Sequence, residues 1–288
     1  MSPENWYLTE DLDEFLARAG DFLHSRPALH TVALSVTDAL RRRGAHYFGP
    51  EDAVFGILDD GVVRAVLIHT PPFHVHVTAL TPQQADALAA RFTELDHPVP
   101  GLSGPLETAE AFAAAWQRRT GTAGTVTQLQ RLYRLGELTF PEPRPEGRAR
   151  IAEPVDRELL IRWKLAFDED TGHGVGQDPA RWADARIAEG GITLWETPDG
   201  TPVSLAGVTP PSAGQVRVAP VYTPPELRGR GYAGAVTVEV SRVAREAGAA
   251  EVVLFTDLAN PTSNGLYQRI GYRPVADFAV WGFGTEGG

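Results

Sequence analysis

The sequence predicts an α/β protein (α+β in some classifications) with two similar domains, each a mixed, mostly antiparallel central sheet flanked by helices. Apolar residues recur at helical spacing in some segments and alternate or run together in others. The same order occurs twice: helices, an antiparallel meander, helix, strand, helix, strand. A proline-rich stretch, "ELTFPEPRPEGRAR" (137–150), separates the two copies, so we place the domains at 1–140 and 141–288.

In the first half, Thr9 is the predicted N-cap of a helix whose first turn is acidic. The residues 53–80 alternate as strands, broken by the turn Asp59-Asp60-Gly61 and by Pro71-Pro72. Periodicity predicts helices over 9–23, 28–43, 81–95 and 105–119, the last ending near Gly121, and a strand over 124–138.

The second half has clearer signals. Gly190 and Gly191 would end one helix, and the turn Pro198-Asp199-Gly200 indicates a hairpin. Predicted helices cover 155–170, 178–191, 231–248 and 260–271. Predicted strands cover 149–154, 192–197, 202–208, 214–223 and 251–257, and the last strand or pair covers 272–283.

The bulk composition excludes several classes of protein. With 43% hydrophobic and 22% charged residues, the 288-residue chain has the composition of a soluble globular protein. Its formal net charge of -11 disfavours a nucleic acid or an anionic membrane as partner. With 0 Cys there is no disulfide, thiolate zinc site or catalytic cysteine. The acidic N-terminus and the lack of a membrane-length apolar run favour a cytoplasmic protein, and the Ala/Arg-rich texture suggests a bacterial one.

The stretch "RGRGYAGAV" (228–236) contains a literal G-x-G-x-x-G at Gly229, Gly231 and Gly234, the spacing of a dinucleotide-binding fingerprint. Its context disfavours that function. Two prolines stand where an apolar strand should lead in, and only 31 residues follow Asp257, too few for the rest of a doubly wound sheet. A P-loop is excluded because no Gly-Lys-Ser/Thr follows.

The same loop is suited to hold another anion. It leads directly into a predicted helix, so its N–H groups converge at the helix N-terminus, where a phosphate is favoured. Gly229 and Gly231 let the ligand approach the backbone and permit positive φ, and Arg228 and Arg230 add positive charge. A glycine-rich turn without ligand is the alternative.

Two motifs resemble the GCN5-related N-acetyltransferase (GNAT) superfamily. "VYTPPELRGRGYAGAVT" resembles its acetyl-CoA signature, Arg/Gln-x-x-Gly-x-Gly/Ala, matched by Arg228, Gly231 and Ala233. "LANPTSNGLYQRIGYRPV" is similar to the following strand and helix, with Asn260 seven residues before Tyr267. The resemblance covers about residues 148–284. The first half resembles a degenerate copy, as in tandem members, because "TALTPQQADALAARF" has no glycine cradle; we therefore expect one cofactor site, in the second half.

The resemblance implies acetyl-CoA as acyl donor, bound in a splay between the fourth and fifth strands of the second domain, without a metal. Backbone groups of Val221 and Thr223 would pair with the pantetheine arm, and the Asn260 amide would also contact it, although Asn260 is equally an N-cap for the next helix. The remaining predicted cofactor contacts are Arg228, Gly229, Arg230, Gly231, Tyr232, Ala233 and Ser263.

The resemblance also implies that Tyr267 protonates the departing thiolate; the alternative is an ordinary core tyrosine. A tyrosine with pKa near 10 keeps its proton at neutral pH. The strand 214–223 has no carboxylate to serve as base, so the candidates lie in "FDEDTGHG", taken as a loop beside the acceptor: Asp168, Glu169, Asp170 and His173. A solvated charge run is the alternative. Asp257 would act through water or hold nearby backbone, and we favour the second.

The sequence therefore predicts an acetyl-CoA-dependent N-acetyltransferase that acetylates a primary amine on a small molecule by direct attack in a ternary complex. The alternatives are another acyl-CoA, a peptide or protein amine as acceptor, or a CoA-binding module without catalysis. His74 and His76 have a spacing that metals use, but without a third ligand we interpret them as half-buried histidines. We expect a monomer or homodimer.

Overall fold

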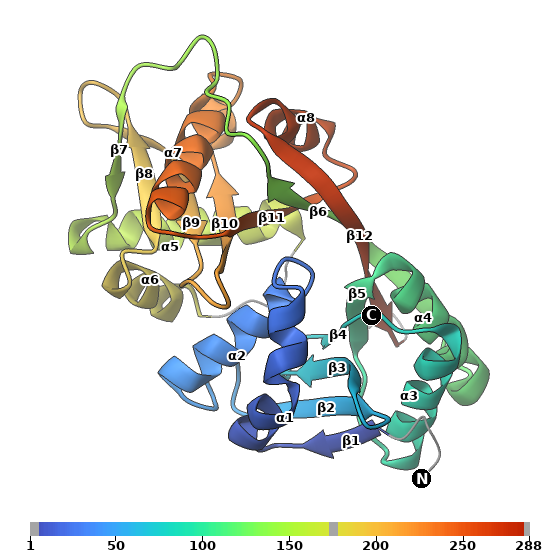
Figure 1. Cartoon of the computed structure of the whole chain (residues 1–288). Helices are drawn as coiled ribbons and strands as arrows, with labels where there is room; N and C mark the ends of the chain where they lie inside the picture. Colours follow the sequence, from blue (N-terminus) through green and yellow to red (C-terminus); the bar gives the residue numbers. More distant parts are fainter. Residues whose placement is uncertain (1–5, 173–177, 285–288) are drawn as a thin grey trace. The chain divides into compact units, whose positions relative to one another are not determined.

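The computed structural model describes residues 6–172 and 178–284 (Figure 1). Packing divides the chain into two compact units. Unit 1 extends to Leu132 and also takes Asp257–Ala259 and the segment from Ala276 onward; unit 2 comprises Tyr133–Thr256 and Asn260–Val275. The division into domains after residue 140 stays a prediction, since strands β6 (Gly124–Leu135) and β12 (Tyr272–Phe283) each contribute residues to both units.

Unit 1 begins with a four-stranded antiparallel meander followed by a parallel pair. Its sheet order is β1-β2-β3-β4-β5-β12, in which β4 and β5 are parallel and β12 pairs antiparallel with β5. The strands are β1 (Trp6–Thr9), β2 (Val54–Asp59), β3 (Val63–His69), β4 (Val75–Val77) and β5 (Gly101–Pro105). The helices are α1 (Leu12–Ser25), α2 (Thr31–Arg43), α3 (Pro82–Glu94) and α4 (Leu106–Thr120).

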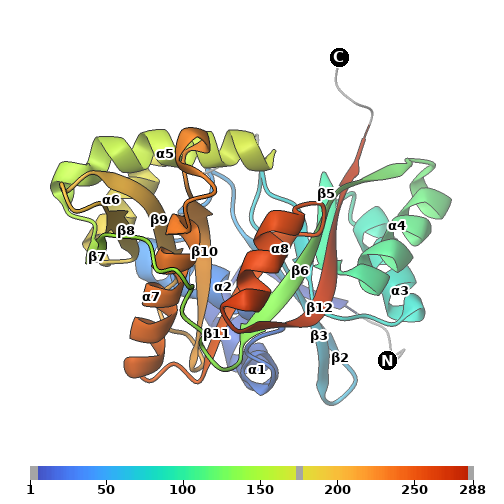
Figure 2. The same ribbon diagram turned by 90° about the horizontal axis from the view of Figure 1, so that it is seen from above.

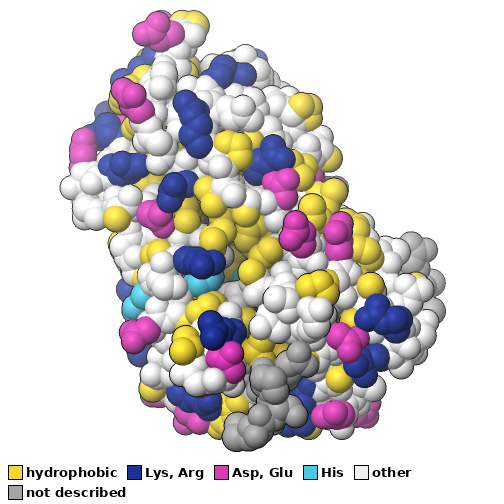
Figure 3. Space-filling view, turned by 45° about the vertical axis from the view of Figure 1, so that its right-hand side comes forward, with side chains coloured by type: hydrophobic (Ala, Val, Ile, Leu, Met, Phe, Trp, Pro, Cys, Tyr) yellow, Lys and Arg dark blue, Asp and Glu magenta, His cyan; other side chains and the backbone are white. Residues whose placement is uncertain are grey.

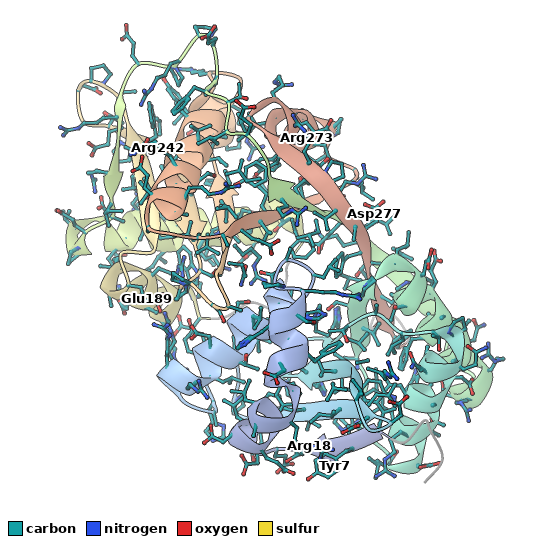
Figure 4. The ribbon with its side chains drawn as sticks, viewed as in Figure 1. Tyr7, Arg18, Glu189, Arg242, Arg273 and Asp277 are labelled. Carbon is teal, nitrogen blue, oxygen red and sulfur yellow. The ribbon has the colours of Figure 1, made fainter. Side chains whose placement is uncertain are left out.

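The core of unit 1 lies between its sheet and helices. Apolar residues of α3 and α4, such as Phe92 and Phe112, are fully buried against strand residues such as Leu67. The Phe15 ring of α1 stacks on Phe55 of β2, with ring centroids 5.0 Å apart. At the edge strand β1, the Arg18 guanidinium lies over the Tyr7 ring (Figure 4). Because successive side chains of a strand point to opposite faces of the sheet, every second residue of these strands can be buried under the same layer of helices.

Unit 2 repeats the same order. Its sheet order is β7-β8-β9-β10-β11-β6, antiparallel as far as β10 and parallel between β10 and β11. The strands are β7 (Arg148–Ile151), β8 (Ile192–Glu196), β9 (Pro202–Val208), β10 (Gln215–Tyr222) and β11 (Glu251–Asp257). The helices are α5 (Arg157–Thr171), α6 (Pro179–Ala188), α7 (Tyr232–Glu246) and α8 (Pro261–Arg269), with 3-10 turns η1 (Pro154–Asp156) and η2 (Pro225–Leu227).

Helices cover both faces of the unit 2 sheet. In Figure 2, α7 lies on one side of β8, β9 and β10, and α5 and α6 lie on the other. Two buried clusters match these layers. Trp195 and Val218 pack with α7, whereas Leu194, Leu205 and Tyr222 pack with α5 and α6. The two predicted halves with mixed, mostly antiparallel sheets are confirmed.

The structure differs from the sequence prediction in the first helix. Thr9 ends β1, and the N-cap of α1 is Asp11, whose carboxylate accepts hydrogen bonds from the N–H groups of Asp13 at 2.9 Å and Glu14 at 3.0 Å. The Thr9 hydroxyl instead donates to the Glu14 side chain at 2.9 Å. Asp11 is the cap because its carboxylate reaches two orphan N–H groups of the first turn.

The surface carries charges of both signs. On the face shown in Figure 3, Lys and Arg side chains are interspersed with Asp and Glu. In the described part of the chain, no helix is long and apolar enough to span a membrane.

Candidate functional site

The strands β10 and β11 of unit 2 pair along only part of their length. In their parallel register, Gln215 pairs with Glu251, Val216 with Val252 and Arg217 with Val253. The pairing ends there. Both strands continue beyond these residues, to Tyr222 and Asp257. The register of β10 with β9 also shifts between Val218 and Val221. The sheet therefore separates between β10 and β11 toward their carboxyl ends, where ligands bind in open α/β sheets.

The glycine loop follows β10 at this end of the sheet. Gly229 has φ +76° and Gly231 has φ +82°, which L side chains rarely adopt. Gly231 is the N-cap of α7, and as a glycine it has no side chain to accept hydrogen bonds from the first-turn N–H groups. A Cβ built on Gly229 would meet nothing within 4 Å. The exposed glycine loop thus leads into the first turn of α7, where the helix dipole favours an anion.

The corresponding helix of unit 1 is built differently. The N-cap of α3 is Thr81, whose hydroxyl accepts from Gln84 N at 3.2 Å while the Gln84 side chain accepts from Thr81 N at 2.9 Å. Pro82 at the first helical position has no N–H group. This capping box satisfies donors that a phosphate would need, which agrees with the expectation of a single cradle.

Arg228 and Arg230 border the glycine loop. Arg228 Nε donates to the Thr223 carbonyl at 2.9 Å, and its guanidinium forms an ion pair with Asp170 of α5. Arg230 donates to the Glu226 carbonyl at 3.2 Å and is exposed. Arg228 is therefore held by an acidic side chain in the position where the predicted phosphate would compete for it.

Val221 and Thr223, the predicted backbone contacts of the pantetheine arm, lie beyond the part of β10 that pairs with β11. Val221 pairs with Ala206 of β9 on one side. Thr223 follows the strand; its hydroxyl lies 2.8 Å from Ser204 Oγ, and its carbonyl is already an acceptor for Arg228. Tyr232 and Ala233 form the first turn of α7 and are half-buried.

Helix α8 follows β11. The Asn260 side chain caps it, accepting from Ser263 N at 3.0 Å, so the interpretation as a helix cap is confirmed. Ser263 lies in the first turn and is half-buried. A contact of Asn260 or Ser263 with a cofactor stays a prediction.

Tyr267 is the buried residue of α8 and packs in the same core cluster as the apolar residues of α7. Its ring is 6.1 Å from that of Tyr272 in a T-shaped arrangement, and only 7% of the residue is exposed. Burial raises the pKa of Tyr267 to about 12. Tyr267 is thus a core tyrosine by packing, and it keeps its proton at neutral pH.

A polar network that the sequence did not indicate holds α8. The Tyr133 hydroxyl donates to the Asn264 side chain at 2.9 Å and accepts from the Gln268 side chain at 3.0 Å. Asn264 also donates to the Asn260 carbonyl at 2.8 Å. Tyr133 is fully buried in β6. In the sequence, Tyr133 is a tyrosine within a predicted strand, and nothing there indicates that it bonds to a residue 131 positions later in the chain.

Asp168, Glu169 and Asp170 belong to the last turns of α5, as the predicted helix over 155–170 has them, so the description of "FDEDTGHG" as a loop is wrong for these three residues. The helix continues to Thr171 because Gly172, with φ +70°, supplies the left-handed C-cap and because Lys164 and Asp168 form an ion pair one turn apart. Asp168 is half-buried and Glu169 is exposed. His173 lies outside the described residues.

Two further candidates have structural partners. The Asp257 carboxylate accepts from Ala259 N at 2.7 Å, so it holds nearby backbone as favoured from the sequence. His76 is buried in β4 with Nδ1 3.1 Å from Ser103 Oγ, while His74 precedes the strand. Among the residues described, no group of three possible ligands is arranged for a metal ion.

Comparison with known proteins agrees with this geometry. Residues 209–281, which include the opening, the glycine loop and α8, match the model of the FR47-like protein family. No curated protein matches the sequence of the chain.

Similar solved structures cover almost the whole chain. A GCN5-related N-acetyltransferase from Sphaerobacter thermophilus has 17% identity and a TM-score of 0.62, with 98% of this chain and 96% of that one covered. An acetyltransferase of the GNAT family from Colwellia psychrerythraea has 10% identity and a TM-score of 0.60, with 97% and 98% covered.

A third structure is a tandem GNAT protein from the clavulanic acid biosynthesis pathway. It has 13% identity and a TM-score of 0.58, with 96% of this chain and 98% of that one covered. At these identities the likeness concerns the fold. The chain therefore has the fold of these structures, with two GNAT-like domains, and residues 209–281 match the FR47-like family in sequence.

Proposed function

We propose that unit 2 binds acetyl-CoA and transfers its acetyl group to a primary amine on a small molecule. The observation that carries this proposal is the opening between β10 and β11 next to the glycine loop, where α7 begins without a side-chain cap. A long thioester-bearing ligand can hydrogen-bond to the unpaired backbone of β10, while its pyrophosphate meets the N–H groups of the loop. The similar solved acetyltransferase structures support the same reaction class.

The residues present fit such a ligand. The N–H groups of Gly229, Gly231, Tyr232 and Ala233 would hold the pyrophosphate, because both glycines have positive φ and leave the backbone accessible. Arg228 would exchange its pair with Asp170 for the phosphate, and Arg230 would add charge nearby. The ligand supplies the thioester; the chain supplies its orientation.

In the transfer, the neutral amine nitrogen bonds to the thioester carbon, the carbon–sulfur bond breaks, the amine loses a proton and the sulfur gains one. Tyr267 would give that proton, because its pKa of about 12 keeps it protonated at neutral pH. The base is unassigned: Asp168 is paired with Lys164, and Glu169 is an exposed candidate.

A second candidate function is a CoA-binding module without catalysis. Two observations favour it: β10 has no carboxylate, and Tyr267 belongs to a buried core cluster. The two functions differ in whether bound acetyl-CoA is consumed.

The experiment incubates the protein with acetyl-CoA and a panel of amines and measures free thiol, with CoA affinity measured separately by calorimetry. We expect thiol release with at least one amine. Tyr267→Phe should slow release about 10²- to 10⁴-fold, the usual contribution of a general acid, and leave CoA affinity nearly unchanged. CoA binding without thiol release for any amine would identify the binding module, and full activity of Tyr267→Phe would remove Tyr267 from the mechanism.

The remaining expectations are part of the same proposal. We propose a cytoplasmic protein of bacterial origin, a monomer or homodimer, with neither a nucleic acid nor a membrane as partner. Another acyl-CoA and a peptide or protein amine are tested by extending the donor and acceptor panels.

A further inference from the structure

Arg217 lies where the opening between β10 and β11 begins. It is the last β10 residue paired with β11, opposite Val253. Its neighbours Val216 and Val218 belong to the cluster packed on α7, so Arg217 points to the opposite face of the sheet, on which α5 and α6 lie. Its main chain is fixed by hydrogen bonds of 2.9 Å to Thr209 in both directions.

No carboxylate of a described residue forms an ion pair with the Arg217 guanidinium. Its Nη1 is enclosed and has no hydrogen-bond partner among the residues that the structure describes. The residue as a whole keeps part of its surface accessible. Burial, and then the charge of Arg186, lower the pKa of Arg217 to about 10, and no acidic group opposes this shift.

Arg186 of α6 is the neighbouring cation, and its guanidinium has an acidic partner. It pairs with Glu189 at 3.2 Å and donates to the carbonyl oxygens of Gly191, at 2.8 Å, and Val208. Glu189 stands at the end of α6 (Figure 4). The charge of Arg186 is therefore matched by Glu189, whereas no residue in the described ranges 6–172 and 178–284 matches that of Arg217.

An enclosed guanidinium N–H group without a partner is costly, and arginine does not escape this cost by losing its proton at neutral pH. An anion that binds Arg217 would recover this cost through charge-assisted hydrogen bonds. We propose that Arg217 forms a carboxylate-binding site at the closed end of the β10–β11 opening, and that the acceptor amine carries a carboxylate which this site holds.

The position of Arg217 suits this role. It precedes Val221, a predicted pantetheine contact, by four residues, or about 13 Å along an extended strand. A carboxylate held at Arg217 would leave the amine of a small amino acid directed toward the opening. The assignment of the acceptor rests on the proposed acyl transfer; the anion site itself does not.

The binding arm requires no activity. Thermal unfolding is measured with sodium propionate, with propionamide and with sodium chloride at equal ionic strength. Propionate should raise the melting temperature of the wild type above both controls, and should not do so for Arg217→Gln. Arg64→Gln is the matched control, because Arg64 is exposed and already paired with Asp60. Equal responses of wild type and Arg217→Gln, or no response of the wild type, would overturn the site.

A second variant covers a purely structural role of this side chain. Arg217→Met removes the unpaired charge and keeps the apolar stem. Without anions, we expect Arg217→Met to unfold at a temperature at or above that of the wild type. A structural arginine would instead show a clear loss of stability in Arg217→Met, and that outcome contradicts the proposal.

The activity arm compares 4-aminobutyrate with butylamine in the thiol-release assay. The wild type should prefer 4-aminobutyrate in kcat/KM, and Arg217→Gln should reduce that preference on the order of 10- to 100-fold, as for a hydrogen-bonded charge. Equal preference in both proteins would refute the acceptor assignment. If no amine releases thiol with the wild type, the proposed acyl transfer fails, while the propionate measurement still decides the anion site.

Discussion

Replacing Gly229 by alanine tests the phosphate cradle. Gly229 has φ +76°, and a Cβ there would meet no atom within 4 Å. The substitution therefore causes no clash in the free protein, and its cost comes from placing an L residue in the left-handed region, about 1 kcal/mol. For a protein of this size that lowers the melting temperature by roughly 2–4 °C.

A bound pyrophosphate changes this result. An anion held by the loop would occupy the space into which the new methyl group projects. To avoid the methyl group, the anion would have to move away from the N–H groups of the loop. We expect Gly229→Ala to weaken CoA binding at least about tenfold, corresponding to the loss of one charge-assisted hydrogen bond of about 1.5 kcal/mol.

The matched control is Gly200→Ala in the turn between β8 and β9. Gly200 has φ +86° and also has no atom within 4 Å of a built Cβ. Its stability cost should equal that of Gly229→Ala, and its CoA affinity should equal that of the wild type. Calorimetric titration with CoA and thermal unfolding measure both quantities. Equal CoA affinities of the two variants would refute the cradle.

Two further predictions concern stability in urea. Burial lowers the pKa of His69 to about 4, so between pH 6.5 and 4 the unfolded chain binds more protons than the folded one. The free energy of unfolding should therefore fall as the pH drops through that range, by up to about 3 kcal/mol. His69→Gln should show a smaller fall, and the same pH dependence in the variant as in the wild type would contradict this. Arg150 pairs with the buried Asp156 and Glu196, so Arg150→Met should cost about 3–5 kcal/mol, whereas Arg148→Met, which removes an exposed partner of Glu196 at 3.4 Å, should cost less than about 1 kcal/mol; similar losses would contradict the difference in burial.

Local patterns determined most of the secondary structure. The helices α3, α4 and α7 and the strands β8, β9 and β11 lie where periodicity predicts them, because each buries one face or both against neighbouring elements. The glycine loop was also readable, since Gly229 and Gly231 have the positive φ that only glycine adopts freely. The strands β1 and β5 were not predicted, because a segment of four or five residues is too short to show a clear alternation of apolar and polar residues.

The sequence did not predict which strands β6 and β12 would lie beside; only the tertiary structure shows this. The sequence order of each half ends on a strand, β6 or β12, and either strand could complete its own half. In the structure β12 pairs with β5 of unit 1, and β6 lies beside β11. Hydrogen bonds of 2.6 and 2.8 Å between Arg131 and Asp277 help join β6 to β12 (Figure 4). Strand alternation specifies which face is buried and leaves the neighbouring strand open.

The sequence by itself determined the two-fold repeat of the fold, the position of the glycine loop before α7 and the lack of cysteine, because these depend on neighbouring residues or on composition. Only the tertiary structure decided that Asp168 pairs with Lys164, that Tyr267 is buried, and that Arg217 Nη1 is enclosed without a hydrogen-bond partner from the described residues. Charge pairing and burial depend on side chains from distant segments, and so on the packing of the folded chain.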